Sequence, residues 1–310
     1  MAAGASARPS AATAARLSIE PRQPGTGSLI RVVVDRPAKS TDSVVVAAGE
    51  LAGEPLHFTN AVGGKRVALA AIPLDASDSV VARVLVDRAS GVIDTLRTVL
   101  HYPHRPPPAP SASRGRTPGA RRLRVDPRFT QRMDSATDAR IEHENELARD
   151  VGHKAHDTPQ LWTFPFLRPR PSRVTGKFGS GRLFNGRVSS SHLGIDYRGA
   201  DGEPIFAANR GVVALVAEFF LAGNVVYIDH GAGVVTGYFH MSKPEVSVGD
   251  TVQRGQEIGL VGATGRVTGP HLHWSARFGA LTIDPGDLLS LGAPFTAPDT
   301  TQKKRPRSKP

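Results

Sequence analysis

The chain has 310 residues and no cysteine, which excludes disulfide bonds and cysteine-based metal sites. Its net charge of +11 equals the charge of two stretches without acids: residues 104–124 contain six Arg, and residues 301–310 contain five Lys or Arg. The rest of the chain is near neutral, so a nucleic-acid-binding function would rest on charge alone. We interpret the two basic stretches as solvated flexible segments, with attraction to an anionic polymer as the alternative.

The first segment, residues 1–16, is rich in Ala and is predicted to be disordered. It lacks the apolar stretch that a secretory signal needs, so any signal for export is not visible in this sequence. The most apolar run, Val212 to Gly223, contains Glu218 and is too short to span a bilayer, so we expect no transmembrane segment.

Residues 17–103 contain short apolar runs, rich in β-branched residues, between turn residues. Strands are predicted at Ser28–Asp35, Ser43–Ala48, Val67–Ile72, Val80–Val86 and Val92–Leu100. Strands of this length and spacing are typical of a β-sandwich, and we expect an immunoglobulin-like one. No catalytic constellation is visible in this region, and His57 and His101 are interpreted as structural or surface residues.

Residues 104–133 read as a Pro- and Arg-rich linker, and residues 134–163 as a helical connector. Asp134 or Ser135 is suited to cap the helix, which has only a thin apolar stripe. The run His143-Glu144 begins like the helix motif of one class of zinc peptidase, but Leu147 stands where that motif needs its second His. We therefore reject that motif here.

Residues 164–290 are dense in Gly and have strand patterns without a long helix between them. The strands are expected at Gly211–Ala217, Asn224–Asp229, Gly233–His240, Glu257–Val261 and His271–Phe278. We predict a second all-β domain, of two sheets or barrel-like. Residues 291–310 are predicted to form a disordered basic tail.

Two short motifs in this second domain carry the chemistry. His192 and Asp196 are four residues apart, and His271 and His273 are two apart. If both segments are strands, each pair points to one face. Two imidazoles and one carboxylate form a three-ligand zinc set that leaves the fourth position to water. The hypothesis is that His192, Asp196 and His273 hold zinc and that His271 stands beside the bound water.

Two other histidines of this domain need separate interpretations. His240 ends an apolar run, and at a strand end facing a metal it would stabilise negative charge on a carbonyl oxygen. Taken alone, it would be a surface histidine. His230 falls at a turn and is interpreted as structural.

With these residues in place, residues 175–289 resemble the lysostaphin-type, or LytM-domain, zinc endopeptidases. The matching segments are Gly194-Ile195-Asp196-Tyr197, Ile228-Asp229-His230-Gly231, Tyr238-Phe239-His240-Met241-Ser242, Val248-Gly249-Asp250 and the run from Gly259 to His273. Phe239 and Met241 depart from the Ala and Leu expected around His240. Arg182 lies in a segment that resembles the one that shapes the groove in this family.

The resemblance implies an antiparallel β core, one Zn²⁺ per chain held by His192, Asp196 and His273, and His240 with His271 as the catalytic pair. It also implies that the chain hydrolyses peptide bonds in bacterial peptidoglycan, with the peptide stems as its partners. The location expected from this activity is outside the cytoplasm, in the periplasm or cell envelope. The basic linker and tail would then contact anionic envelope polymers.

Three alternatives stay open at this level. An inactive module that recruits other hydrolases would have lost a metal ligand, whereas every ligand position is filled here. Self-inhibition is a second alternative, in which Asn145 or one of five histidines of residues 101–165 fills the fourth zinc position or blocks the groove: His101, His104, His143, His153 and His156. The bond cut is either a glycine bridge or a D-alanyl–diaminopimelyl bond, and the segment around Asn185 favours the latter.

Overall fold

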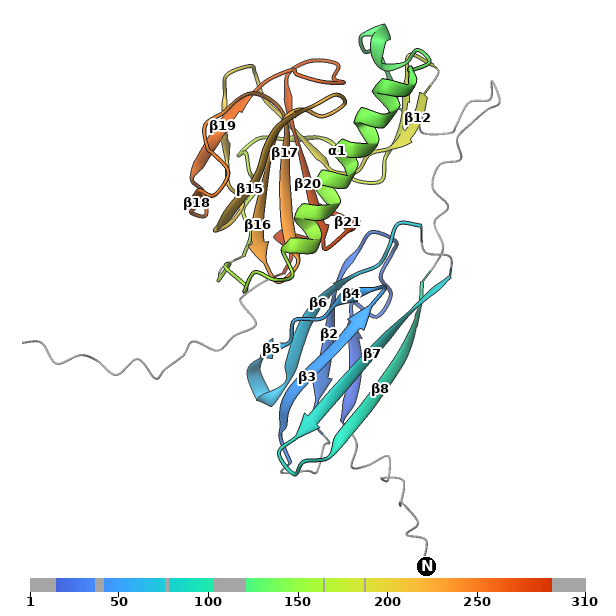
Figure 1. Ribbon diagram of the computed structural model, residues 1–310, viewed down its shortest axis with the longest axis vertical. Coiled ribbons are helices and arrows are strands. Elements are labelled where there is room, and N and C mark those ends of the chain that lie inside the picture. Colours follow the sequence, from blue (N-terminus) through green and yellow to red (C-terminus); the bar gives the residue numbers. More distant parts are fainter. Residues whose placement is uncertain are drawn as a thin grey trace, which may run out of the picture.

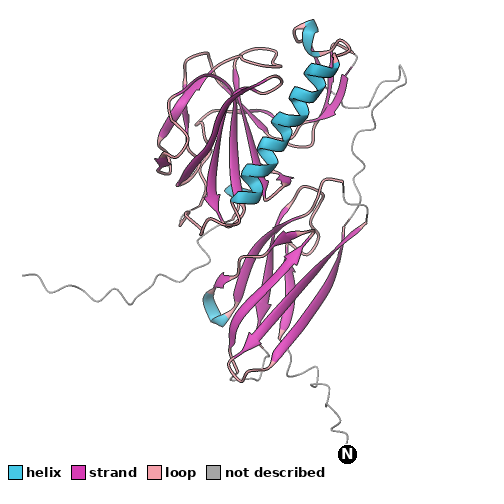
Figure 2. Ribbon diagram, viewed as in Figure 1, coloured by secondary structure: helices cyan, strands magenta, loops and turns pink. Residues whose placement is uncertain are grey.

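The computed structural model describes residues 15–36, 42–75, 78–102, 121–163, 165–186 and 188–291. The predicted disorder of the two ends and the first part of the predicted linker therefore lie almost wholly outside the described residues. Within them, the chain is mostly β with one long helix between two β regions (Figures 1 and 2). Neither described helix is long and apolar enough to cross a membrane.

The first β region consists of two four-stranded sheets. One sheet has the order β1-β2-β6-β5, with bounds Arg16–Glu20, Leu29–Asp35, Arg66–Ala71 and Thr59–Asn60. The other has the order β4-β3-β7-β8, with bounds Glu54–Pro55, Val44–Leu51, Ser79–Arg88 and Ile93–His101. A short 3₁₀ turn, η1 (Val62–Gly64), precedes β6.

These two sheets share one apolar core, as the predicted sandwich requires. In β7 the side chains alternate between exposed and buried, and Val84 and Val86 point inward to the same cluster as Val32 and Val34 of β2. Alternation with a period of two buries one face of each sheet against the other. The strands β1, β4 and β5 were not predicted, because each is short or lacks a run of β-branched residues.

The connector between the β regions contains β9 (Arg121–Leu123), the 3₁₀ turn η2 (Pro127–Phe129) and helix α1 (Ser135–Lys154). As expected, Asp134 caps the helix, since its side chain accepts a hydrogen bond from the backbone N–H of Thr137. The last part of the predicted linker differs from a free linker, because β9 pairs with a strand of the second β region and Phe129 packs into a small core with Phe184.

Helix α1 lies across the second β region, and the rejected zinc motif proves to be part of this packing. Ala148 and Val151 pack against Val225 and Val235 of the sheet beneath. Glu144 is buried and accepts hydrogen bonds from the backbone N–H of Phe220, at 2.8 and 2.9 Å. Its carboxylate therefore fixes the helix to the sheet.

The second β region is built on one ten-stranded antiparallel sheet. Seven strands follow the order β10-β13-β20-β17-β16-β15-β18, and β14, β19 and β21 pair beside them. Their bounds are Val174–Gly176 (β10), Ile195–Arg198 (β13), Pro204–Phe206 (β14), Gly211–Phe219 (β15), Gly223–Gly231 (β16), Val234–Pro244 (β17), Thr251–Val252 (β18), Glu257–Val261 (β19), His271–Phe278 (β20) and Leu281–Ile283 (β21). A separate three-stranded sheet contains β12 (Val188–Ser191), β11 (Gly181–Phe184) and β9, and helix α2 (Pro285–Leu289) closes the region.

The two β regions pack directly on each other. Leu29 and Leu69 of the first region belong to the same buried cluster as Trp162, Phe166 and Leu288. The close packing of these apolar side chains holds the first region against the second, below α1 in the view of Figure 1.

Candidate metal centre and its cleft

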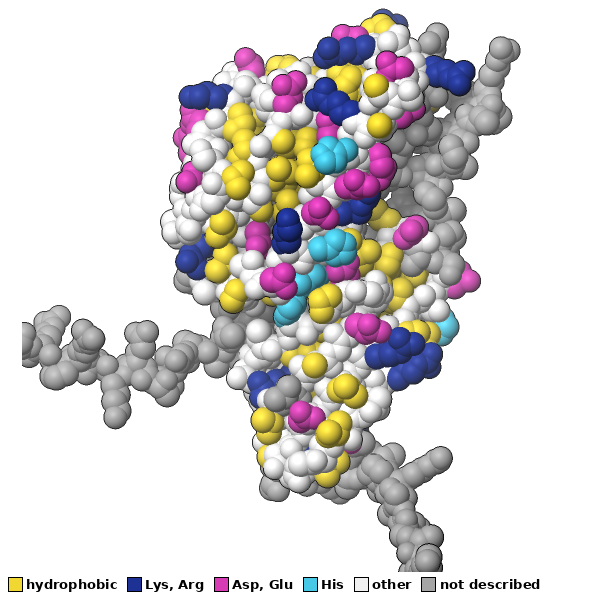
Figure 3. Space-filling view, in the orientation of Figure 1, with side chains coloured by type: hydrophobic (Ala, Val, Ile, Leu, Met, Phe, Trp, Pro, Cys, Tyr) yellow, Lys and Arg dark blue, Asp and Glu magenta, His cyan; other side chains and the backbone are white. Residues whose placement is uncertain are grey.

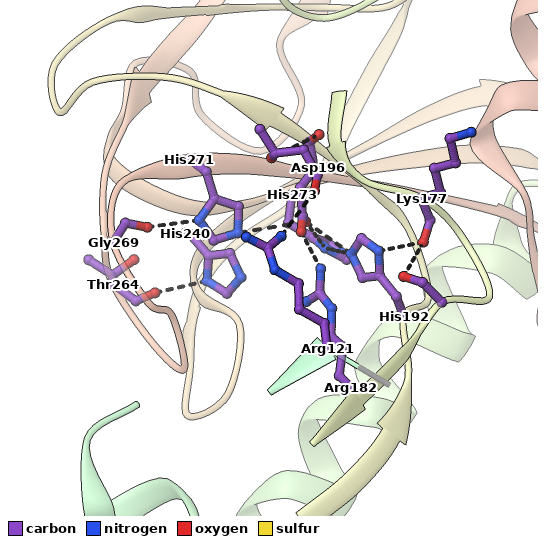
Figure 4. Close-up of polar contacts among 12 residues, drawn as sticks. Arg121, Lys177, Arg182, His192, Asp196, His240, Thr264, Gly269, His271 and His273 are labelled. Carbon is purple, nitrogen blue, oxygen red and sulfur yellow. Dashed lines mark hydrogen bonds and ion pairs between the residues drawn. The ribbon is translucent and has the colours of Figure 1, made fainter. Parts of the chain in front are cut away.

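Three predicted ligands converge at one point of the second β region. Asp196 of β13 lies directly opposite His273 of β20 in the antiparallel pair. The Nε2 atom of His192 is 2.9 Å from Nδ1 of His273 and 2.9 Å from Oδ1 of Asp196, and His273 Nδ1 is 3.0 Å from the same oxygen. All three residues are buried, and their ligand atoms form a group able to hold a metal ion (Figure 4).

The route by which His192 reaches this point differs from the expected one. His192 is not in a strand with Asp196 but lies in the turn between β12 and β13. The turn passes so close to the cluster that a Cβ atom on Gly194 would lie 2.5 Å from Nε2 of His273. Glycine at this position therefore lets the turn fold over His273 and bring His192 to the ligand point.

Hydrogen bonds outside the cluster orient its members. His192 Nδ1 is 2.9 Å from the carbonyl oxygen of Lys177, so its N–H donates there and Nε2 is left as the ligand atom. Arg182 of β11 pairs with Oδ2 of Asp196, which leaves Oδ1 to face the imidazoles. Such outer contacts fix the orientation of metal ligands and set their tautomers.

His240 and His271, which the sequence analysis assigned as the catalytic pair, lie beside the three ligands. The ring centroid of His240 is 5.0 Å from that of His271 and 5.9 Å from that of His273. His271 Nε2 is 3.6 Å from Oδ1 of Asp196. The Nδ1 atoms bond to backbone carbonyls, at 2.9 Å to Thr264 for His240 and at 2.8 Å to Gly269 for His271. In each ring Nε2 is therefore the nitrogen that remains for substrate.

A β-bulge aims His240 at the cluster. The sequence predicted a strand that ends at His240, but β17 continues to Pro244. Across from it, Val226 pairs with Tyr238 and Asn224 with Met241, so two residues of β17 oppose one of β16 at this place. His240 has a positive φ of 64°, which is uncommon for a residue with a side chain and occurs often at functional sites.

Burial sets the protonation states of these groups. Burial lowers the pKa of His273 to about 4, although its hydrogen bond to Asp196 acts in the opposite direction. Burial, together with the neighbouring His271 and His273, lowers the pKa of His240 well below its ordinary value. Burial alone would raise the pKa of Asp196, but its contacts with His192 and His273 outweigh burial and hold that pKa far below its usual range. An ionised carboxylate with neutral imidazoles is the state that metal binding requires.

A cleft of about 420 Å³ opens beside the metal centre. Its walls come from β9, from β11 and the residues before it, and from the loop that leads into β20. Arg121, Arg182 and Arg266 line it, together with Asp196 and His271. Arg121 and Arg266 were not recognised in the sequence as residues of the site. The run of Arg at 121–124 was the available signal, but its charge was assigned to a flexible linker.

His230, interpreted as structural and expected at a turn, lies instead within strand β16. His230 is fully buried, with ring nitrogens 2.8 Å from the carbonyl oxygen of Arg210 and 2.8 Å from Oγ1 of Thr236. Of the residues considered for self-inhibition, none that the structure describes lines the cleft. His104 lies outside the described residues. The preceding segment meets the cleft through β9 instead.

The site region matches known proteins in sequence. Residues 190–285 match the model of "Peptidase family M23". Peptidoglycan DD-endopeptidase ShyC of Vibrio cholerae is 43% identical over 115 residues, which cover 36% of this chain and 26% of that protein. DD-carboxypeptidase/endopeptidase Mpg of Neisseria meningitidis is 40% identical over 111 residues, which cover 36% of this chain and 24% of that protein. The match thus spans about a quarter of each relative.

The fold of most of the chain also matches a solved structure. A protein from Pseudomonas aeruginosa, solved as a candidate M23 peptidase, superposes with a TM-score of 0.60 at 24% identity. The match covers 86% of this chain and 95% of that chain. At this identity the likeness establishes the fold alone.

Proposed function

Because residues 190–285 belong to peptidase family M23, we propose that this chain is a zinc metalloendopeptidase that hydrolyses peptide cross-links of bacterial peptidoglycan. One observation carries the proposal: three ligand atoms of His192, Asp196 and His273 meet within 3.0 Å of one another, and two more imidazoles stand beside them. No ligand position is missing, which favours an enzyme over an activator module that has lost its metal.

Zinc is the ion that fits these donors. Two imidazole nitrogens and one carboxylate oxygen are a common catalytic zinc set. Tetrahedral zinc, with ligand bonds of about 2.0–2.1 Å, needs its ligand atoms roughly 3.3 Å apart, so a small outward shift of the three groups accommodates it. Bound there, zinc would polarise the scissile carbonyl and lower the pKa of its water to about 7.

We assign the proton transfers and the oxyanion to the two other histidines. His271 Nε2 is placed to accept the proton of the attacking water and to deliver a proton to the leaving nitrogen. In its protonated form, with Nδ1–H donated to Thr264, His240 would donate a hydrogen bond from Nε2–H to the carbonyl oxygen, whose developing negative charge favours that form. The backbone carbonyls that hold both Nδ1 atoms keep the rings in these orientations.

The D-alanyl–diaminopimelyl cross-link is the substrate we propose. ShyC and Mpg are named as enzymes that act on DD bonds, and they are 43% and 40% identical to this chain over 115 and 111 residues. A protein with this activity would act in the periplasm or cell envelope. The basic stretches at 104–124 and 301–310 would contact anionic envelope polymers there.

The first β region is proposed to be an immunoglobulin-like domain. Its sheets group the strands as β1-β2-β6-β5 and β4-β3-β7-β8, which matches an immunoglobulin order when the strands are lettered along the chain. We retain the division into a β-sandwich at 17–103, a linker at 104–133, a connector at 134–163 and a peptidase domain at 164–290, except that β9 and η2 at the end of the linker pack on the peptidase domain.

The function is tested on purified peptidoglycan with the full chain. We expect about one zinc per chain by metal analysis, loss of turbidity of a cell-wall suspension, and mass spectra in which cross-linked dimers become monomers cut at the D-alanyl–diaminopimelyl bond. A zinc-loaded protein that leaves the dimers intact would contradict the proposal. Cleavage only in the presence of another hydrolase would favour the activator module.

A further inference from the structure

The charges that line the cleft beside the metal centre are strongly unbalanced. Its cationic side chains are Arg121, Lys177, Arg182, Arg198 and Arg266. Among the described residues that line it, Asp196 is the only acid, and both its oxygens are engaged by the imidazoles and by Arg182. A zinc ion would add further positive charge. The cleft is therefore suited to an anionic group of a ligand.

Arg266 is held in the cleft wall by packing. Its guanidinium lies 4.3 Å above the ring centroid of Phe184, and its backbone N–H donates to the carbonyl oxygen of Leu221 at 2.9 Å. No described carboxylate forms an ion pair with it. Burial, and then the positive charge of Arg182, lower the pKa of Arg266, so an anion that approached it would relieve an unfavourable environment.

Arg121 places a further guanidinium on the same wall. It stands opposite Arg182 in the parallel pair of β9 and β11. Its Nη1 atom donates to the carbonyl oxygen of Thr175 at 3.1 Å, which fixes the side chain without neutralising it. In Figure 4 the side chains of Arg121 and Arg182 both extend toward the cluster of Asp196 and His273.

We propose that Arg266 and Arg121 form a carboxylate subsite, which binds a free carboxylate on the carbon that bears the leaving nitrogen of the substrate. This inference rests on the proposed function. His271, which we assign to protonate that nitrogen, lines the same cleft as the two guanidiniums, so the residue that bears the nitrogen would enter the cleft that they line. A guanidinium binds a carboxylate through two parallel hydrogen bonds, which gives both affinity and orientation.

The chemistry of the cross-links makes this subsite selective. In a D-alanyl–diaminopimelyl bond, the nitrogen is attached to a carbon that also carries a free carboxylate. A terminal D-alanyl–D-alanine has the same arrangement, whereas a nitrogen inside a glycine bridge is attached to a carbon without a charge. The subsite would therefore accept the first two substrates and discriminate against the third.

The experiment compares substrates that differ only in this carboxylate. The zinc-loaded full chain is given a cross-linked dimer, the same dimer with that diaminopimelyl carboxylate amidated, and a peptide that ends in D-alanyl–D-alanine. Because amidation removes the negative charge that the guanidiniums bind, it should lower kcat/KM by about 10- to 100-fold, mainly by raising KM. Cleavage of the terminal peptide would show that the subsite also accepts the free carboxylate of a terminal D-alanine.

The variants Arg266→Gln and Arg121→Gln should remove this discrimination. Each should lower kcat/KM for the free carboxylate while changing the amidated dimer little, and Arg266→Lys should retain part of the preference. Arg254→Gln is the matched control, because Arg254 bonds to the carbonyl oxygen of Pro165 and does not line the cleft. Zinc content and melting temperature are measured for every variant, so that a folding defect is recognised.

A binding measurement separates this proposal from the proposed function. Calorimetry follows the peptide with a terminal D-alanine carboxylate, and its amide, on wild type and Arg266→Gln. Carboxylate-selective binding that Arg266→Gln weakens, without cleavage of any substrate, would support the subsite and refute the peptidase. Cleavage with equal rates for free and amidated dimers would refute the subsite and leave the peptidase standing. Neither cleavage nor selective binding would refute both.

Discussion

Two clusters of histidine and carboxylate side chains can be compared among the residues that the structure describes, and one of the two is built as a metal site. The metal centre contains His192, Asp196 and His273. The other, which we name the junction cluster, consists of Glu54 and His57 of the first β region and His156 beyond the end of α1. In the space-filling view, histidine side chains lie on the face where α1 meets the first β region (Figure 3).

The two groups differ in how their nitrogens are used. In the junction cluster, His156 Nε2 is 2.8 Å from Oε2 of Glu54, and His156 Nδ1 is 2.8 Å from Nε2 of His57. These contacts form a chain of pairs, and Glu54 also accepts a hydrogen bond from the backbone N–H of Ala280. At the metal centre, by contrast, ligand atoms from different elements meet at one point. Residue types alone therefore do not make a metal site; converging lone pairs do.

Removal of a metal ligand should have the largest effect. We expect His192→Ala and Asp196→Ala to lose zinc and with it all measurable hydrolysis, because two remaining ligands hold the ion poorly. Asp196→Ala additionally leaves Arg182 without its carboxylate partner. Metal analysis after gel filtration, with a muropeptide assay, measures both. His156→Ala is the matched control at the junction cluster, and a loss of zinc from that variant would break the distinction between the two groups.

Replacement of a histidine that does not bind the metal should have a smaller effect at the same site. His240→Ala should fold, keep its zinc and lose about 10²- to 10³-fold in kcat, the usual cost of one oxyanion donor. His143→Ala, an exposed change on α1, serves as the control. Activity of His240→Ala equal to that of wild type would remove His240 from the mechanism.

The strand pattern and the ligand set were predictable from the sequence, and the physical reason is local. Period-two alternation and a β-branched run define β7, and the predicted limits of β20 agree with the structure. His271 and His273 are two residues apart in that strand, so one face carries both. The family resemblance assigned His240 as well, although its run of residues indicated only a strand end.

Features that depend on distant contacts were not predictable. The bulge at His240 is defined by the pairing of β17 with β16, which no spacing within β17 reveals. β9 is three residues long, and it is a strand only because β11 provides its hydrogen bonds. A Pro- and Arg-rich composition therefore indicated a linker up to residue 133, although Arg121 lines the cleft. The junction cluster joins residues about a hundred positions apart and left no local pattern.

At the junction cluster we expect a loss of stability without a loss of metal. Burial would raise the pKa of Glu54, but hydrogen bonds from His156 and Ala280 outweigh it and lower that pKa. The contribution of Glu54 to stability is therefore present near neutral pH and is lost as the pH falls through its lowered pKa. Glu54→Ala also leaves the N–H of Ala280 unpaired, so we expect a loss of about 1–3 kcal/mol in the free energy of unfolding.

Urea unfolding at pH 7.5, with zinc content measured in parallel, tests this expectation. The close fit at the cluster supports it, since a Cβ on Gly279 would lie 1.9 Å from Oε2 of Glu54. Glu50→Ala is the matched control, because Glu50 is an exposed acid of the same region that pairs with exposed Arg83. If Glu54→Ala were as stable as Glu50→Ala, the junction cluster would hold the regions together no better than a surface ion pair.

The smallest effect is expected at a second contact between the two regions. Asp287 of α2 accepts a hydrogen bond from the backbone N–H of Leu29 at 2.8 Å, and burial raises its pKa to about 6, helped by the nearby charge of Asp284. A carboxyl whose pKa is raised in the folded protein binds more protons folded than unfolded between about pH 4 and 6. Its contribution to stability therefore falls as the pH rises through this window.

Asp287→Asn keeps an acceptor for Leu29 but cannot ionise. Relative to this variant, wild type should lose about 1 kcal/mol or less between pH 4.5 and 7.5, given partial solvent screening. Urea unfolding of both proteins measures the difference in their free energies of unfolding, and a chelator removes the influence of metal binding. If that difference stays constant with pH, Asp287 does not titrate in this way.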